Sequence, residues 1–293
     1  MTYDKFLDLL EEEIDSNLAP GEHIRRVQVL KNNNVHLDGF SCMMPGRREQ
    51  PTVYVNNYYR SSPDPDYIRE IAQMVLNLQR GSRTLPGEEI KKLLEFDKAR
   101  DLIYSKLISA TRNTELLEQV PCRKWLDLAI VYYLKIPDSI IKNATALVRT
   151  EHLRSWGLTP EELHEIAVRN MRREPAFFQP LEQLLGEYGL DDSNSHLYVL
   201  STSRKEYGAA CILDPGVQSM CGERLGGDYY VLPSSIHEVI LLPASDTPEN
   251  ADLEEIVHTV NRRCVRAEEY LSGSVYYYSA AEKRMSLCEK GRA

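Results

Sequence analysis

The stretch DYYVLPSSIHEVILLP, residues 228–243, decides how this chain folds. Two apolar runs, DYYVLP (228–233) and VILLP (239–243), flank the polar segment SSIHE. Both runs are short, end at a proline and are rich in aromatic or β-branched residues, which favours strands over helices. We therefore predict two β-strands, over residues 228–233 and 237–243, joined by a polar turn.

The neighbouring segments continue this pattern. HLYVLST (196–202), GAACIL (208–213) and SVYYYS (274–279) predict further strands, and residues 214–225 predict a helix. A second helix is expected over residues 251–265, and five of its side chains are expected to face inward: Leu253, Ile256, Val257, Val260 and Cys264. The order strand–strand–helix–strand–strand–helix favours an antiparallel sheet with helices on one face.

The first half of the chain mixes helices and strands in the same way. Helices are predicted over residues 2–18, 65–80, 88–100, 113–120 and 159–171. A hairpin is expected over 23–40, and strands over 52–59, 102–110, 126–136 and 144–150. In the helix 159–171, His164 and Glu165 lie off the apolar stripe, so both are expected to face solvent.

These elements predict an α+β fold, in which antiparallel sheet units are covered by helices and form two closely packed lobes. We place the lobes at residues 1–150 and 151–293. A boundary within residues 175–195, or one continuous domain, remains an alternative.

Composition narrows the class of protein. Of the 293 residues, 42% are hydrophobic and 27% are charged, which is typical of a globular protein. The net charge of −9 argues against a nucleic-acid partner. The sequence contains no run of about 18 apolar residues, which a membrane-spanning helix would need. Its acidic first segment does not resemble a secretory signal. A cytoplasmic protein is expected.

The six cysteines show no metal-binding spacing. No two of them form a C-x-x-C pair, so we expect reduced, buried thiols. The segments typical of nucleotide binding, G-x-x-x-x-G-K-S/T and G-x-G-x-x-G, do not occur. We expect neither a metal nor another cofactor.

The pair His237–Glu238 raises the question of a catalytic site. It begins like the zinc motif H-E-x-x-H, but Leu241 stands where the second histidine belongs. On a strand, the side chains of His237 and Glu238 point to opposite faces and cannot act on each other. An acid–base role would need partners from elsewhere, and each residue is otherwise satisfied by a backbone group or hydroxyl.

Serines and tyrosines supply the remaining candidates. Ser234 and Ser235 precede His237, but no G-x-S-x-G segment marks a nucleophile. Tyrosine is frequent, with 17 Tyr against 5 Phe. A phenol joins an apolar ring to a polar tip, so Tyr58, Tyr59 and Tyr277 are candidates for a binding face, although strand packing explains them as well.

Several long segments resemble one family. TYDKFLDLLEEEI, PTVYVNNYY, SWGLTPEELHEIAVRNM and above all GGDYYVLPSSIHEVILLP are similar to a domain-of-unknown-function family of Gram-positive (Firmicutes) gut bacteria. The resemblance covers nearly the whole chain. It implies one continuous cytoplasmic unit and assigns no activity, cofactor or catalytic residue.

These observations favour a non-enzymatic binding or adaptor protein, with a protein partner or a homodimer formed through a sheet edge or tyrosine-rich face. The alternative is a hydrolase with its site around Ser234, Ser235, His237 and Glu238. The hydrolase hypothesis requires His237 or Glu238 in a concave pocket beside a second titratable group.

Overall fold

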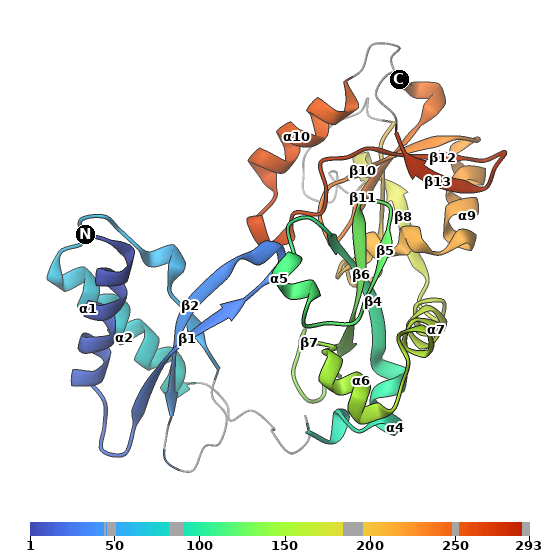
Figure 1. Cartoon of the computed structure of the whole chain (residues 1–293). Coiled ribbons are helices and arrows are strands. Elements are labelled where there is room, and N and C mark those ends of the chain that lie inside the picture. Colours follow the sequence, from blue (N-terminus) through green and yellow to red (C-terminus); the bar gives the residue numbers. More distant parts are fainter. Residues whose placement is uncertain (44, 46–50, 82–90, 184–195, 248–251, 289–293) are drawn as a thin grey trace. The chain divides into compact units, whose positions relative to one another are not determined.

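A computed structural model describes residues 1–43, 45, 51–81, 91–183, 196–247 and 252–288 (Figure 1). Its contacts fall into two compact units. Unit 1 comprises Met1–Lys31, Val35–Leu93 and Asp138–Lys142, and unit 2 comprises Asn32–Asn34, Leu94–Pro137 and Asn143–Ala293. Helices and antiparallel sheets build the chain, which confirms the α+β class.

The predicted lobe boundary at residue 150 falls inside unit 2. Whether residues 1–150 and 151–293 fold separately stays a prediction. None of the described helices combines the length and the hydrophobicity needed to cross a bilayer.

The sheet of unit 1 grows from the predicted hairpin. Strands β1 (His23–Leu30) and β2 (His36–Met43) pair antiparallel along their whole length, which confirms the prediction. The strand predicted over 52–59 is shorter: only β3 (Val53–Tyr54) pairs with β2, and a 3-10 turn, η2 (Asn56–Tyr58), follows. The Asn56 Oδ1 atom accepts the backbone N–H of Asp38 at 2.9 Å, so a side chain continues the pairing where the strand has ended.

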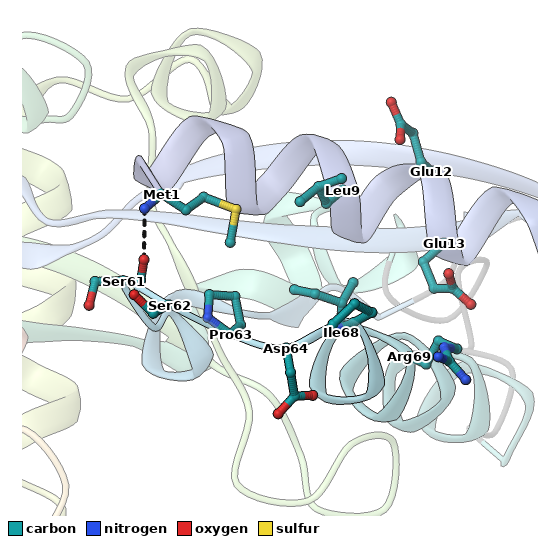
Figure 2. Close-up of a pocket in the computed structure, with 11 residues that line it drawn as sticks. Met1, Leu9, Glu12, Glu13, Ser61, Ser62, Pro63, Asp64, Ile68 and Arg69 are labelled. Carbon is teal, nitrogen blue, oxygen red and sulfur yellow. Dashed lines mark hydrogen bonds between the residues drawn. The ribbon is translucent and has the colours of Figure 1, made fainter.

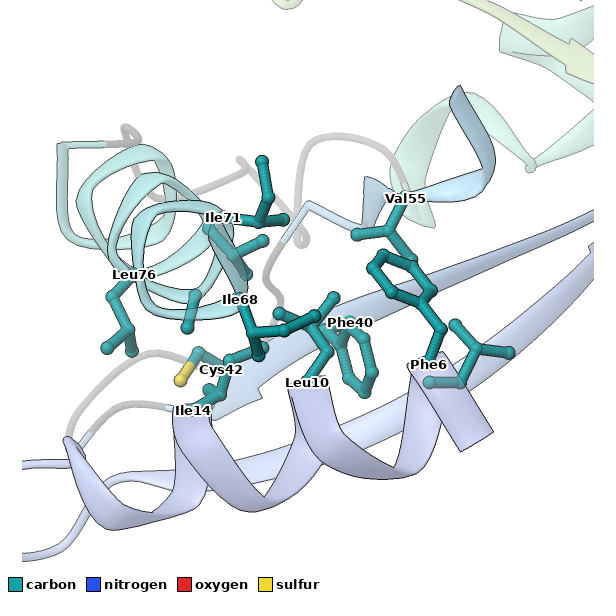
Figure 3. Close-up of a cluster of buried hydrophobic side chains, with 12 residues drawn as sticks. Phe6, Leu10, Ile14, Phe40, Cys42, Val55, Ile68, Ile71 and Leu76 are labelled. Carbon is teal, nitrogen blue, oxygen red and sulfur yellow. The ribbon is translucent and has the colours of Figure 1, made fainter. Parts of the chain in front are cut away.

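Two amphipathic helices cover this sheet. Helix α1 (Tyr3–Ser16) is capped by Thr2, and the Asp64 Oδ1 atom accepts the backbone N–H of Tyr67 in the first turn of α2 (Pro65–Gly81), as predicted. Their apolar faces meet strand β2 in a buried cluster, shown in Figure 3. Its twelve members are Phe6, Leu7, Leu10, Ile14, Phe40, Cys42, Val55, Ile68, Ile71, Ala72, Val75 and Leu76.

The first sheet of unit 2 is centred on β6 (Leu128–Lys135). Strand β4 (Ile103–Ser109) pairs along one edge of β6, and the short strands β5 (Cys122–Trp125) and β7 (Thr145–Leu147) share the other. Three short helices lie before, between and after these strands in the sequence: α4 (Phe96–Ala99), α5 (Thr114–Leu117) and α6 (Thr150–Trp156). The 3-10 turn η3 (Arg100–Leu102) connects α4 to β4. Helix α7 (Pro160–Met171) begins with the predicted capping box between Thr159 and Glu162.

The second sheet of unit 2 has six antiparallel strands in the order β13-β12-β10-β11-β9-β8. At its centre, β10 (Tyr229–Pro233) pairs with β11 (Val239–Pro243), so the opening stretch does form two adjacent strands. The other strands are β8 (Ala176–Pro180), β9 (Tyr198–Thr202), β12 (Tyr276–Ser279) and β13 (Arg284–Leu287).

Helices lie on both faces of this sheet, so the prediction of one covered face was wrong. Helix α9 (Pro215–Leu225) contacts Tyr229, whose hydroxyl donates to the Gln218 carbonyl at 3.2 Å. Helix α10 (Leu253–Cys264) packs on Tyr230 through Leu253 and Val257. Adjacent residues of a strand point to opposite faces, which places α9 and α10 on opposite sides.

Two details of the predicted elements were also wrong. GAACIL forms a 3-10 helix, η4 (Gly208–Leu213), instead of a strand. A Cβ atom on Gly208 would lie 2.4 Å from the Thr202 nitrogen and 2.6 Å from the His237 oxygen. The first residue of η4 therefore packs directly against the backbone of Thr202 and His237. In α10, Ile256 and Val260 are exposed, as is Cys264, and the buried face consists of Leu253, Val257 and Asn261.

The prediction of buried thiols holds for only three of the six cysteines. Cys42, Cys211 and Cys221 are buried, Cys288 is half-buried, and Cys122 and Cys264 are exposed.

Candidate functional site

The segment SSIHE forms a turn between β10 and β11, and β11 begins only at Val239. The Ser235 N–H donates to the Glu238 carbonyl at 3.1 Å, and the Ser235 hydroxyl accepts the His237 N–H at 3.0 Å. The strand predicted from residue 237 therefore starts two residues later. Ser235 is buried and closes the turn with its own hydroxyl, which is a structural role.

His237 is held by Tyr207. The two rings stack with centroids 5.4 Å apart at 16°, and the Nδ1 atom accepts the Tyr207 backbone N–H at 3.2 Å. A nitrogen that accepts a hydrogen bond carries no proton, so the neutral ring keeps its proton on Nε2. That atom lies 4.0 Å from the Glu269 carboxylate.

Burial lowers the pKa of His237. Glu269 opposes this shift, and the charge of Lys106, whose Nζ lies 4.6 Å from the Tyr207 ring centre, adds to it. Glu238 has a different environment: burial raises the pKa of its carboxyl, and Lys205 partly offsets the shift. The two side chains thus interact with different charges, and neither serves as the other's partner.

No serine hydroxyl contacts the His237 ring through any hydrogen bond of the described residues. The Ser201 hydroxyl does bond to His237, but to its backbone: it donates to the His237 carbonyl at 2.7 Å. Ser234 is half-buried. Across the described ranges, no cluster of three His, Cys, Asp or Glu side chains could hold a metal ion.

The candidate tyrosines belong to different units. Tyr58 packs partly buried on the unit 1 core, and its carbonyl accepts the Tyr67 hydroxyl at 2.9 Å. The Tyr59 hydroxyl donates to the Met1 carbonyl at 2.7 Å. Tyr277 belongs to unit 2, where its hydroxyl donates to Asp228. Each hydroxyl of Tyr59 and Tyr277 is therefore already engaged within its own unit.

His164 departs from its predicted exposure, although Glu165 is exposed as expected. The His164 ring is half-buried, and its Nδ1 atom lies 3.1 Å from the hydroxyl of the buried Tyr132. Burial lowers the pKa of His164, and Arg123 adds to the shift. A surface cavity of 420 Å³ adjoins this histidine, lined by His164, Glu165, Val168, Arg169 and Arg172, all from α7 and its C-cap.

Unit 1 contains a cavity of 480 Å³ between α1 and the start of α2 (Figure 2). Leu9 and Ile68 supply apolar walls, and the Met1 amino group donates to the Ser61 carbonyl at 2.7 Å across one end. Glu12 and Glu13 stand at the other end. This cavity offers carboxylates on an apolar floor.

Unit 2 contains a larger cavity, of 540 Å³, that sequence reasoning missed. We call it the α10 hollow, defined by its lining residues Arg112, Glu255, His258, Asn261, Arg262 and Tyr270. They come from three segments: the loop after β4, helix α10, and the residue that follows the 3-10 turn η6 (Ala267–Glu269). No spacing in the sequence connects these segments, so no motif could have revealed the hollow.

Two arginines dominate the charge of the α10 hollow. The Arg112 guanidinium lies over the Tyr270 ring, 3.7 Å from its centre, which orients it without neutralising it. Arg262 reaches Glu255 only at 3.9 Å, with both side chains about two-thirds exposed, so this pair is weak. The hollow thus presents two guanidinium groups against one carboxylate.

Polar groups also shape the floor of the hollow. Asn261 is buried, and its Nδ2 atom donates to the Ser272 carbonyl at 2.8 Å. Gly273 lies close beneath: a Cβ atom there would stand 2.6 Å from the His258 ring and 3.2 Å from the Tyr270 hydroxyl. The absent side chain at Gly273 is what lets both rings sit where they do.

Comparison with known proteins identifies the family of this chain. Residues 3–280 match the model of DUF5688, a family of unknown function. The chain belongs to this family. The matched range includes the SSIHE turn and every residue of the α10 hollow. No curated protein and no solved structure matches the chain. A Gram-positive origin stays a prediction.

Proposed function

We propose that this protein binds a small anionic molecule in the α10 hollow and does not transform it. The observation that carries the proposal is the pair Arg112 and Arg262 lining one cavity, with Arg112 fixed on Tyr270. A planar guanidinium donates two parallel hydrogen bonds to a carboxylate or phosphate, which makes arginine well suited to such ligands.

The charge of the whole chain strengthens this argument. The net charge is −9, so an anion is repelled by the protein on average. The α10 hollow departs from this average, because it contains two arginines. One is held on an aromatic ring and the other is weakly paired, so both can bind an anionic group. The sequence predicted a cytoplasmic, non-enzymatic binding or adaptor protein. Of these two roles the proposal favours binding, with a small molecule as the ligand.

The contacts of His237 speak against the hydrolase alternative. A general base must offer a free lone pair to the proton it removes. The one lone pair of neutral His237 accepts the Tyr207 N–H, and the Ser235 hydroxyl is engaged with the turn. A hydrolase that used His237 as its general base would need the bond to Tyr207 to break before chemistry could begin.

Calorimetric titration with inorganic phosphate and with citrate tests the proposal. For the unaltered protein we expect a saturable site with a dissociation constant on the order of 1 mM for at least one anion at low ionic strength. The variants Arg112→Ala and Arg262→Ala should each weaken binding about tenfold, because each removes a charge-assisted hydrogen bond.

Arg284→Ala is the matched control. Arg284 resembles Arg262 in exposure (72% against 70%) and in its distant carboxylate (Glu282 at 3.7 Å), but it does not line the hollow. Its variant should bind within about twofold of the parent. Equal losses in all three variants would mean that only net charge matters, and no saturable binding of either anion would refute the proposal.

A further inference from the structure

The tip between β1 and β2 is made of three asparagines, Asn32–Asn34, which form the 3-10 turn η1 and belong to unit 2. Asn33 and Asn34 have left-handed backbones, with φ of 63° and 52°. Asparagine tolerates this conformation better than other side chains with a Cβ. Their backbones are alike, but their side chains have different partners.

Asn33 and Asn113 form a reciprocal amide pair. The Asn33 backbone N–H donates to the Asn113 Oδ1 atom at 2.6 Å, and the Asn113 Nδ2 atom donates to the Asn33 Oδ1 atom at 2.9 Å. Asn113 is fully buried and also donates to the Ser109 carbonyl at 2.8 Å. This pair fixes the loop after β4 one residue beyond Arg112.

The remaining donor group of Asn33 fixes the opposite wall of the hollow. Its Nδ2 atom donates to the Tyr270 carbonyl at 2.8 Å and to the Ala267 carbonyl at 2.7 Å. Both acceptors belong to the segment that carries the Tyr270 ring. Both N–H groups and the oxygen of the Asn33 carboxamide thus bond to the two segments that supply Arg112 and Tyr270.

We propose that Asn33 is a positioning residue of the α10 hollow: it holds the Arg112 loop and the Tyr270 segment together so that the guanidinium stays over the ring. This inference rests on the proposed function for its effect on binding. A ligand that meets a fixed arginine avoids the entropy cost of ordering it, so loss of Asn33 should weaken anion binding about fivefold.

Asn33→Gly and Asn34→Gly make a matched pair of variants. Glycine accepts both left-handed backbones, so neither change strains the turn. Asn34 loses only a 3.4 Å contact to the Thr114 hydroxyl, and that contact does not reach the hollow. Phosphate binding should weaken about fivefold in Asn33→Gly and stay within about twofold in Asn34→Gly.

A second variant guards against loss of folding. Asn33→Asp keeps the oxygen that accepts from Asn113 and removes the two bonds to Ala267 and Tyr270. It should also weaken phosphate binding, and its folded fraction can be checked by circular dichroism.

A thermodynamic cycle with Arg112→Ala separates positioning from general damage. If Asn33 acts through Arg112, then Asn33→Gly should cause no further loss of affinity in the Arg112→Ala background. Additive losses would overturn the inference. So would equal affinity in Asn33→Gly and the unaltered protein, or an equal loss in Asn34→Gly.

A readout without ligand keeps the two proposals distinguishable. The Arg112 Nε–H resonance lies over an aromatic ring, so Asn33→Gly should move it toward the position of a free arginine, while Asn34→Gly should not. A resonance that moves in a protein that binds no anion would retain the positioning role and refute the binding function. A resonance that does not move would refute the positioning role itself.

Discussion

His237 stacks on Tyr207 and accepts the backbone N–H of the same residue, so one side chain fixes both the ring and the main chain of the other. Tyr207 has a left-handed backbone, with φ of 49°, immediately before η4. A non-glycine residue in that region is held there by its surroundings. His237 is therefore best understood as the support of a strained turn.

This role predicts a pH dependence of stability. Burial holds the pKa of folded His237 below the value of about 6.5 found in unfolded chains. As the pH falls below about 6.5, the unfolded chain takes up a proton that the folded chain resists, so the free energy of unfolding decreases. The contribution of neutral His237 to the free energy of unfolding should be fully present above about pH 6.5. It should decline as the pH falls from there through the pKa of the folded state.

His237→Asn isolates this contribution. The asparagine Oδ1 atom can occupy the place of Nδ1 but does not titrate in this range. Urea unfolding followed by tryptophan fluorescence reports on unit 2 alone, because Trp125 and Trp156 both belong to it. The variant should lose less stability than the parent between pH 7.5 and 5.5. His152 and His164, whose pKa values burial also lowers, contribute to the remainder. An unchanged pH dependence would contradict the role of His237.

Gly208→Ala should destabilise unit 2 by about 3 kcal/mol or more, because the added methyl group meets two backbone atoms that cannot move independently. Gly226→Ala provides the contrast. Its site is open, but its φ of 83° strains an alanine, so we expect a loss of about 1 kcal/mol. Urea midpoints of the two variants compare the effects of space and of backbone conformation, and similar losses would contradict the close packing of Gly208.

Asp127 should be a strong anchor of the C-terminal strands. Its carboxylate accepts hydroxyls from Ser272 at 2.9 Å, Ser274 at 3.0 Å and Tyr276 at 2.8 Å. Tyr276 is fully buried, and burial together with Asp127 raises the pKa of its hydroxyl. Asp127→Ala leaves these donors without an acceptor and should cost about 3 kcal/mol.

Tyr276→Phe removes one of these bonds and should cost about 1 kcal/mol. The double variant should lose less than the sum of the two single variants, because the phenylalanine no longer needs an acceptor. Strict additivity in urea unfolding would show that the carboxylate and the phenol act independently.

The sequence predicted best what local hydrogen bonds decide. Thr2, Asp64 and Thr159 each cap a helix through contacts within three residues, so the pattern contains the whole cause. Strands β10 and β11 follow from a short apolar alternation in the same way. In the candidate site, the predicted divergence of His237 and Glu238 rested on a strand that begins only after them, at Val239, so it stays a prediction.

What failed depends on contacts distant in sequence. GAACIL has the composition of a strand, but Gly208 is pressed against Thr202 and His237, which pattern analysis does not detect. Ile256 and Val260 suit a buried face, but the sheet meets α10 at Leu253 and Val257. The α10 hollow joins Arg112 to Tyr270 across more than half of unit 2, and Asn33 reaches both segments from the turn between β1 and β2.

The most direct test of the anion site is a phosphate titration of the protein labelled with nitrogen-15 at its arginine side chains. The variants Arg112→Ala and Arg262→Ala assign the two relevant Nε–H resonances, and Arg284→Ala assigns the control. We predict that the Arg112 and Arg262 resonances shift with one common saturation curve while the Arg284 resonance stays in place. Shifts of similar size in all three, or none in Arg112 and Arg262, would contradict an anion-binding α10 hollow.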